Sequence, residues 1–415
     1  MKKLLLLFII VFCINIFASP MTENTSDVML QGFHWNSHFS PCWWKVIEDK
    51  AGDISNAGFD MVWFPPSSSS AAVEGYLPNR LYILDSGYGN SRELTDAIRA
   101  LHNKGVRVIG DIVINHRVGT KDWADFTDPV WGADSVCSND EWFGAKGSYD
   151  TGAGYHAARD IDHTRSYVRD SIVNWMNMLK GVGYDGWRYD FVKGFNGRFV
   201  DYYNSKTDPY FSVGEYWVDL DVYDPDGNRQ QICDWLDSTG GNSYAFDFTT
   251  KGLLQHAINN SEYFRLKDYR NRPAGLIGWW PERSATFIDN HDTGPSTGGN
   301  GGQNHWPFPG DKILVGYAYI LTHPGIPCVY WPHYFDWGND NRQAIKKLIS
   351  IRKSFGITSG SKVNVLLADN SKYVANITGN NGQLIVKIGP GNYTPGASDW
   401  KLLTSGNDYA LWGKK

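Results

Sequence analysis

The sequence lacks several features that mark other classes of protein. Its 415 residues carry a formal net charge of -5 with both signs mixed and no basic cluster, so a nucleic-acid partner is not expected. The one long apolar run, residues 4–17, is too short to span a bilayer, so no membrane association is expected. Internal repeats and low-complexity tails are also missing. These absences favour a globular protein.

Cysteine is scarce, with five residues and no C-x-x-C pair, so a zinc cluster is not expected. Cys13 lies in the N-terminal apolar run, and Cys42, Cys137, Cys233 and Cys328 are widely spaced. Their spacing does not say whether disulfides form.

The N-terminus has the pattern of a secretory signal peptide. Lys2 and Lys3 precede the apolar run, and Ala18-Ser19 supplies small residues for cleavage. We therefore expect residues 1–19 to be removed from a secreted protein. Whether release is periplasmic or extracellular stays open.

Apolar and aromatic residues are plentiful. The apolar content of 42% can bury a core suited to one large α/β barrel plus a small extra domain. Most of the 18 Trp residues are expected in that core, but loop-placed rings can stack on the apolar faces of sugars.

Short apolar runs alternate with amphipathic stretches along most of the chain. Several runs are continuously hydrophobic, as in a parallel sheet that is covered on both faces. The stretches 91–104 and 164–180 have helical spacing. Eight such strands alternating with helices predict a (β/α)8 TIM barrel; the runs are 28–35, 59–64, 106–114, 184–191, 210–217, 244–248, 285–289 and 327–331.

Two segments depart from this alternation. The connection after the third strand is rich in Gly, Asp and Trp and is too long for a simple loop, which predicts an inserted loop domain at 116–162. Past residue 358 the runs become short and alternating, which predicts a C-terminal antiparallel β domain at 358–415. The barrel then comprises 20–115 and 163–357.

Carboxylates stand at the ends of three predicted strands, at Asp190, Glu215 and Asp292. One such residue alone would be read as a helix N-cap. Barrel geometry, however, brings all strand ends to one cleft. Paired carboxylates at one cleft suit acetal hydrolysis through an oxocarbenium-like transition state.

Arg188 precedes Asp190 by two residues, so both side chains lie on the same face of a strand. A cation there favours the ionised, nucleophilic form of the carboxylate. A structural ion pair is the alternative explanation for this arginine.

Four segments, 111–116, 186–190, Glu215 and 287–292, resemble the four short motifs of the α-amylase family, glycoside hydrolase family 13. Further segments at 31–35, 75–80, 160–163, 278–281, 306–309 and 406–409 resemble the plant-type α-amylases of cereal seeds. The resemblance covers nearly all of the mature chain in order, and the N-terminus resembles that of a bacterial member.

This resemblance implies a role for each matching position. Asp190 is then the nucleophile, Glu215 the general acid/base and Asp292 the stabiliser of the transition state. Matching sugar-binding positions are Tyr76, His116, Arg188, Lys193 and His291, with Trp279 and Trp280 as a surface starch-binding pair. Taken singly, Tyr76 could be core, Lys193 a solvated charge and the Trp pair ordinary packing.

The resemblance also implies a structural Ca²⁺ that ties the inserted loop to the barrel. Hard cations prefer oxygen ligands. The matching positions are Asn115, Asp150 and Asp160, with the carbonyls of Ala153 and Gly194.

The sequence departs from the plant pattern at three places. Gly154 stands where those enzymes carry an Asp, so we predict one calcium ion rather than several. Pro332 replaces an Asp after the eighth strand, so outer subsites differ. Asn392 falls where some relatives have a sugar-binding Tyr, with Tyr393 adjacent.

The expected function is endo-hydrolysis of α-1,4 bonds in starch, amylose, amylopectin and malto-oligosaccharides, by a monomer. A transglycosylase is an alternative, because it uses the same covalent intermediate. A non-catalytic glucan-binding protein is a second alternative, since a fold alone does not give a function.

Overall fold

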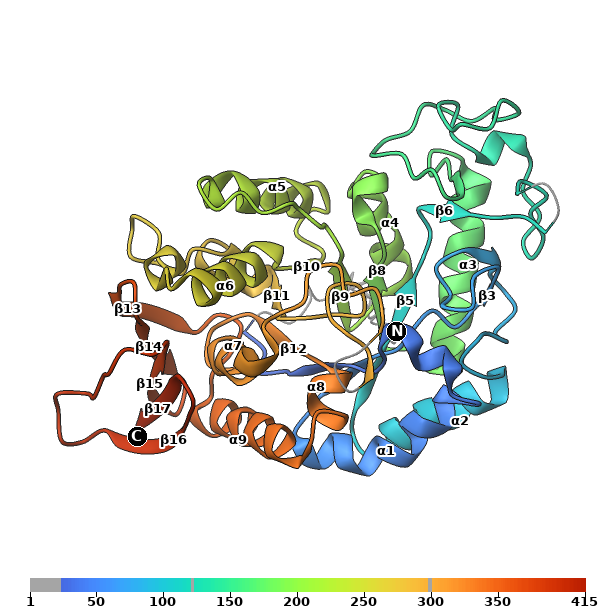
Figure 1. Cartoon of the computed structure of the whole chain (residues 1–415). Coiled ribbons are helices and arrows are strands. Elements are labelled where there is room, and N and C mark those ends of the chain that lie inside the picture. The colour runs from blue at the N-terminus through green and yellow to red at the C-terminus, as the bar shows by residue number, and fades with distance from the viewer. Residues whose placement is uncertain (1–23, 121–122, 298–300) are drawn as a thin grey trace, which may run out of the picture.

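The computed structural model describes residues 24–120, 123–297 and 301–415, so the predicted signal peptide lies outside the described residues. Eight parallel strands close into a barrel in the order β1-β12-β11-β10-β9-β8-β5-β2 (Figure 1). The predicted TIM barrel is therefore confirmed, and each predicted run contains or overlaps one strand. The barrel strands are β1 (Met29–Gln31), β2 (Met61–Trp63), β5 (Arg107–Ile112), β8 (Gly186–Tyr189), β9 (Phe211–Gly214), β10 (Tyr244–Phe246), β11 (Ser284–Thr286) and β12 (Ile326–Tyr330).

Helices cover the outside of the barrel, which explains why its strands read as unbroken apolar runs: nearly every strand residue is buried. The predicted helix at 91–104 begins where expected, because the Asn90 side chain accepts hydrogen bonds from the N–H groups of Arg92 and Glu93. The helices are α1 (Trp43–Ala57), α2 (Ser91–His102), α3 (Ser166–Val182), α4 (Arg198–Thr207), α5 (Pro225–Ser238), α6 (Phe248–Asn260), α7 (Ile313–Ile320), α8 (Trp331–Phe335) and α9 (Asn339–Phe355).

The long connection after β5 folds beside the barrel, in the upper right of Figure 1. It starts with β6 (His116–Arg117), which pairs with β7 (Arg159–Asp160) in an antiparallel ladder that sets His116 opposite Asp160. A second small hairpin, β3 (Ser69–Ser70) and β4 (Pro78–Arg80), was not predicted. It carries Tyr76 in its turn.

The C-terminal segment forms the predicted antiparallel sheet, in the order β13-β14-β15-β17-β16. Its buried face, which includes Tyr373, Leu384 and Leu411, joins the main apolar core beside α7 and α9. The strands are β13 (Lys362–Ala368), β14 (Tyr373–Gly379), β15 (Gly382–Ile388), β16 (Lys401–Gly406) and β17 (Tyr409–Lys414).

Two further features bear on the expectations from composition. Cys42, Cys137, Cys233 and Cys328 are all free thiols in the described residues. Within the same residues, no helix combines the length and the apolar character needed to cross a membrane.

Candidate active site

Asp190 and Glu215 stand directly after two neighbouring strands in matching register. In the β8–β9 ladder, Tyr189 is paired with Gly214, so the next residue along each strand is one of the two acids. The N–H of Glu215 donates to the Tyr189 carbonyl at 3.0 Å, and the N–H of Asp190 donates to Ile112 at 3.0 Å. Backbone hydrogen bonds therefore set the positions of both carboxylates.

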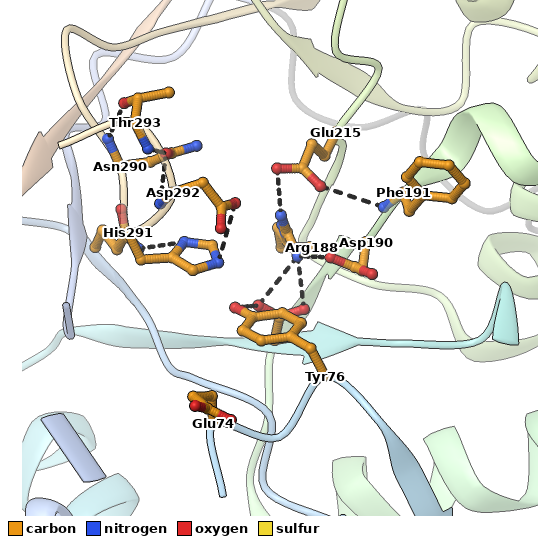
Figure 2. A network of polar contacts seen from close by, with 12 residues as sticks. Glu74, Tyr76, Arg188, Asp190, Phe191, Glu215, Asn290, His291, Asp292 and Thr293 are labelled. Carbon is orange, nitrogen blue, oxygen red and sulfur yellow. Dashed lines mark hydrogen bonds and ion pairs between the residues drawn. The ribbon is translucent and has the colours of Figure 1, made fainter. Parts of the chain in front are cut away.

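Arg188 contacts both of these acids. Its Nη1 donates to Asp190 Oδ1 at 2.7 Å, and its Nη2 lies 2.7 Å from Glu215 Oε1 (Figure 2). The guanidinium is fully buried and lies 4.8 Å from the centre of the Trp63 ring. One planar fork thus holds both carboxylates in fixed relative positions.

The backbone after the first acid is unusual. Phe191 has φ 41°, in the left-handed region that a bulky residue rarely adopts. This conformation lets its N–H donate to Glu215 Oε2 at 3.3 Å. Such strain is found where the surrounding structure fixes a functional geometry.

The electrostatics separate Glu215 from an ordinary carboxyl. The pKa of Glu215 is raised to about 8: burial is the largest cause, the charges of Asp190 and Asp292 add to the rise, and the nearby Arg188 charge opposes it. Burial likewise raises the pKa of Asp292. A protonated carboxyl near neutral pH is what a general acid requires.

Asp292 lies across the site from this pair, as Figure 2 shows. A tight turn presents it: the Asn290 side chain accepts hydrogen bonds from the N–H groups of Asp292 at 3.0 Å and Thr293 at 2.9 Å. Turns of this kind are a common use of Asn. The third acid therefore projects from a fixed loop at the end of β11.

His291 and Tyr76 form one side of the site. Their rings are stacked with centroids 5.0 Å apart, and the Trp35 ring lies parallel to both, 6.0 Å from Tyr76 and 6.1 Å from His291. The Gln31 amide donates to His291 Nδ1 at 2.9 Å, which leaves the ring proton on Nε2, 3.4 Å from Asp292. Burial lowers the pKa of His291 well below its usual value, so the ring is neutral.

The other two predicted sugar contacts lie nearer the inserted segment. The ring of His116 donates from Nε2 to the Tyr76 carbonyl at 2.8 Å and stacks on Tyr155 with centroids 3.9 Å apart. Lys193 is half-buried in the short helix η3 (Val192–Gly194), and its carbonyl accepts a hydrogen bond from the Ala153 N–H at 2.8 Å. The structure thus brings His116 to Tyr76 and Lys193 to the inserted loop.

Asp111 is a site residue to which sequence reasoning assigned no role. Its Oδ2 accepts hydrogen bonds from Trp63 Nε1 and from the Tyr76 hydroxyl, both at 3.0 Å, and its Oδ1 lies 3.0 Å from Arg188. Its position at the start of the 111–116 motif was the available signal. Asp111 therefore holds both the Arg188 guanidinium and the Tyr76 hydroxyl in place beside the acids.

A second unassigned group holds the loop that carries Asp292. Lys251 in α6 is fully buried; its Nζ donates to Gln255 at 2.6 Å and to the Trp306 carbonyl at 2.9 Å, and lies 3.5 Å from Asp289. Asp289 in turn accepts the Thr293 hydroxyl at 3.0 Å. A lone Lys in a helix gives no sequence signal for this role.

The predicted surface pair, Trp279 and Trp280, is half-buried. The Arg229 guanidinium lies 3.8 Å from the centre of the Trp279 ring, and Trp280 packs against the main core. The starch-binding role of the pair stays a prediction.

The predicted calcium ligands come from three segments that meet beside the cleft. A Cβ added to Gly194 would lie 1.9 Å from Asn115 Oδ1, so that amide rests against the Gly194 backbone. Asp150 Oδ2 is buried with no hydrogen-bond partner. Burial raises the pKa of Asp160 to about 7, and the Asp150 charge adds to that rise, so the two carboxylates are close.

These groups fit a hard cation, because oxygens predominate and an uncompensated buried carboxylate oxygen is present. Among the described residues no three His, Cys, Asp or Glu side chains converge as a ligand group. A cation here would therefore need the amide and carbonyl oxygens as well.

Comparison with known proteins identifies the two parts of the chain. Residues 43–219 match the family described as "Alpha amylase, catalytic domain" and residues 354–413 match "Alpha-amylase C-terminal beta-sheet domain". Among solved structures, the cyclomaltodextrin glucanotransferase CldA covers 94% of this chain and 99% of its own, with a TM-score of 0.73 and 16% identity. A likeness at that identity shows the fold alone.

Curated relatives show more. "Probable alpha-amylase 2" of Arabidopsis thaliana is 42% identical over 402 residues, which cover 94% of each chain. "Alpha-amylase 3, chloroplastic" of the same plant is 40% identical over 409 residues, covering 95% of this chain and 45% of that protein. With the barrel, the C-terminal sheet and the three converging acids, these matches establish that the chain belongs to the α-amylase family, glycoside hydrolase family 13, and is a hydrolase of α-glucans.

Proposed function

We propose that this chain cuts internal α-1,4 bonds of starch and related glucans with retention of configuration. The observation that carries the proposal is the fork of Arg188 between Asp190 and Glu215. Each of these acids follows one member of a residue pair in adjacent strands, and adjacent strands lie about 4.8 Å apart. Retaining glycosidases require carboxyl groups about 5–5.5 Å apart, whereas inverting ones need a wider gap.

The first half-reaction follows from these positions. An oxygen of Asp190 attacks the anomeric carbon while Glu215 gives its proton to the departing glycosidic oxygen, so the bond to the leaving sugar breaks as the ester to Asp190 forms. The raised pKa of Glu215 keeps that proton available near neutral pH. Asp292 and the neutral His291 lie across the site from Glu215, where they would face the sugar ring on which positive charge develops.

The second half-reaction reverses these roles. Glu215, now ionised, takes a proton from water, whose oxygen attacks the anomeric carbon and releases Asp190. Two inversions at one carbon restore the original configuration. Transfer to a sugar hydroxyl instead of water would make the chain a transglycosylase.

One experiment tests reaction type and outcome together. Amylose is digested and the anomeric protons of the new products are followed by NMR from the first minutes. We expect α-anomers first, with reducing ends that increase as viscosity falls. Initial β-anomers would contradict the assignment of Asp190, and long or cyclic products without new reducing ends would establish transfer.

A bound Ca²⁺ is part of the proposal. Asn115, Asp150 and Asp160, with the carbonyls of Ala153 and Gly194, would hold it, and it would supply cross-linking charge between the inserted segment and the barrel rather than chemistry. The buried, unpartnered Asp150 Oδ2 supports this assignment.

Secretion is likewise proposed, from residues 1–19. Its support is the charged, apolar and small-residue order of that segment. Mass spectrometry of the N-terminus of protein recovered outside the cytoplasm tests it, and an intact Met1 there would contradict it.

A further inference from the structure

A second groove lies outside the cleft, on the flank where α5 and α6 neighbour each other (Figure 1). It is an open cavity of about 400 Å³ between residues 222–226 and residues 264–269. None of the residues assigned to hydrolysis lines it. Its lining includes Tyr223, Phe264 and Tyr269, which are 84%, 41% and 77% exposed.

Three large aromatic side chains in contact with water around one groove are unusual, since such rings are mostly buried in this chain. Scattered single apolar residues on a surface need no explanation, but a cluster rimmed by charge marks a binding surface. The charged rim here is formed by Asp224, Asp226, Arg265 and Lys267, and the buried Asp268 also lines the groove.

The rings are held in place rather than loose. The Arg265 guanidinium lies 5.1 Å from the centre of the Tyr223 ring and 5.2 Å from that of Phe264. Arg265 is itself fixed, because Nη1 donates to the Val222 carbonyl at 2.9 Å and Nε bonds to Glu262. One anchored cation therefore orders two of the three rings.

The third ring projects from a rigid turn. The Asp268 carboxylate, next to Tyr269, accepts hydrogen bonds from the N–H of Arg270 at 2.9 Å and of Arg272 at 2.8 Å, and lies 3.0 Å from buried Arg229. The Asn271 side chain donates to the Val365 carbonyl at 2.9 Å, which fastens the turn to β13. A preformed surface loses little entropy on binding.

The groove shares one lining residue with a second cavity. Val222 also lines a second cavity of about 420 Å³, whose other residues include Trp217 and Trp306. Trp217 follows Glu215 by two residues, and the Trp306 carbonyl accepts a hydrogen bond from the Lys251 ammonium. The segment that follows Glu215 thus lines the two cavities in turn, from Trp217 in the second cavity to Tyr223 in the groove.

We propose that this groove is an accessory binding site for a distal stretch of the same α-glucan chain. This inference rests on the proposed function for its ligand. Flat rings cover the apolar faces of glucose units, and the surrounding carboxylates and guanidinium offer acceptors and donors for hydroxyls. The site adds affinity for polymers that span both regions and none for chains that fill only the cleft.

The test compares long and short substrates. Replacing Tyr223→Ala and Tyr269→Ala together is expected to raise KM for amylopectin roughly threefold to tenfold, the loss of two aromatic contacts. The kcat/KM for maltoheptaose is expected to stay within about twofold, because short chains do not reach the groove. Phe143→Ala, which removes a fully exposed ring from the inserted segment, is the matched control and should change neither.

A binding assay keeps the result independent of catalysis. Retardation in gels containing amylopectin is measured in a Glu215→Gln background, with and without the two Tyr changes. Weaker retardation of the double Ala variant, together with normal retardation of Tyr223→Phe, supports stacking of sugars on the rings of this site. If the double variant keeps the wild-type retardation and the wild-type KM for amylopectin, the inference is overturned but hydrolysis still stands. If the double variant loses turnover of maltoheptaose, the inference is also overturned, because the two rings would then belong to the active site. A wild-type protein inert on both substrates refutes the proposed function instead.

Discussion

The guanidinium of Arg188 lies 2.7 Å from the carboxylate of Glu215, and both side chains are almost completely removed from solvent. Even with this cation beside it, Glu215 has a raised pKa, because burial and the charges of Asp190 and Asp292 outweigh the attraction. The raised pKa of Glu215 therefore results from burial and several neighbouring charges together, not from a single contact.

The first prediction concerns the pH dependence of catalysis. The kcat/KM for amylose should fall above about pH 8, where free Glu215 loses its proton. In Asp292→Asn the residual activity should fall at lower pH, because one of the charges that raise the pKa of Glu215 is gone. Profiles of both proteins check this; an alkaline limb that stays or moves upward in the variant would contradict it.

The second prediction concerns stability. A carboxyl whose pKa is higher in the folded than in the unfolded state favours folding fully below its unfolded pKa, and this contribution is lost as pH rises through the folded value. For Glu215 that window runs from its ordinary value of 4.5 to about 8. Glu215→Gln has no such loss, so its Tm relative to the wild type should rise between pH 5 and pH 8. Parallel melting curves would be evidence against the raised pKa.

The third prediction separates chemistry from binding. Asp190→Asn should reduce kcat on starch by at least about 10³-fold, since no covalent intermediate can form. Retardation by amylopectin should change little, because the ring stack of Tyr76 and His291 remains. Asp208→Asn, at the end of α4, serves as a charge-matched control with normal turnover. Near-normal turnover of Asp190→Asn would falsify the assigned nucleophile.

The fourth prediction concerns calcium. An ion bound only by the folded state stabilises it, so excess EDTA should lower the Tm of the wild type on the order of 5 °C. Asp150→Asn should melt lower at the outset and respond less to EDTA, because the buried Oδ2 ligand is lost. Asp170→Asn removes an exposed carboxylate of α3 and should respond like the wild type. Identical EDTA responses of all three proteins would reject the site.

The fifth prediction concerns the buried Lys251–Asp289 pair. Lys251→Met should destabilise the fold by about 3–5 kcal/mol, because it leaves Asp289 charged without its cation. Adding Asp289→Asn should cost less than the sum of the single changes, by at least about 1 kcal/mol. Lys347→Met, on the exposed face of α9, should stay within about 0.5 kcal/mol of the wild type. Strict additivity in urea unfolding would show that the two side chains are uncoupled.

The barrel could be predicted because its strands are buried on both faces and so read as apolar runs. The run at 327–331, for example, overlaps β12 (Ile326–Tyr330) in four of its five residues. The acids could be located because parallel strands end on one side, which needs no knowledge of loops. The C-terminal β domain followed from alternation, and β13 to β17 all lie within the predicted range 358–415.

Contacts between distant segments could not be predicted in the same way. Nothing near Lys251 indicates that its ammonium reaches the Trp306 carbonyl, which lies 55 residues away. The environment of Trp279 could not be predicted either. Two adjacent Trp residues are equally compatible with exposure and with packing, and only the fold shows that Arg229 lies against the Trp279 ring. Hairpin β3–β4 was missed because its strands are two and three residues long.

The pairing of Tyr189 with Gly214 has a consequence for how such enzymes diversify. The two backbones that carry the acids lie one strand spacing apart, about 4.8 Å, whatever the lengths of the connections. Surface segments can thus be lengthened, shortened or exchanged, which changes the polymer that is bound, while the placement of the two acids stays the same. A single inserted residue inside either strand, by contrast, would turn one acid to the opposite face and end turnover altogether.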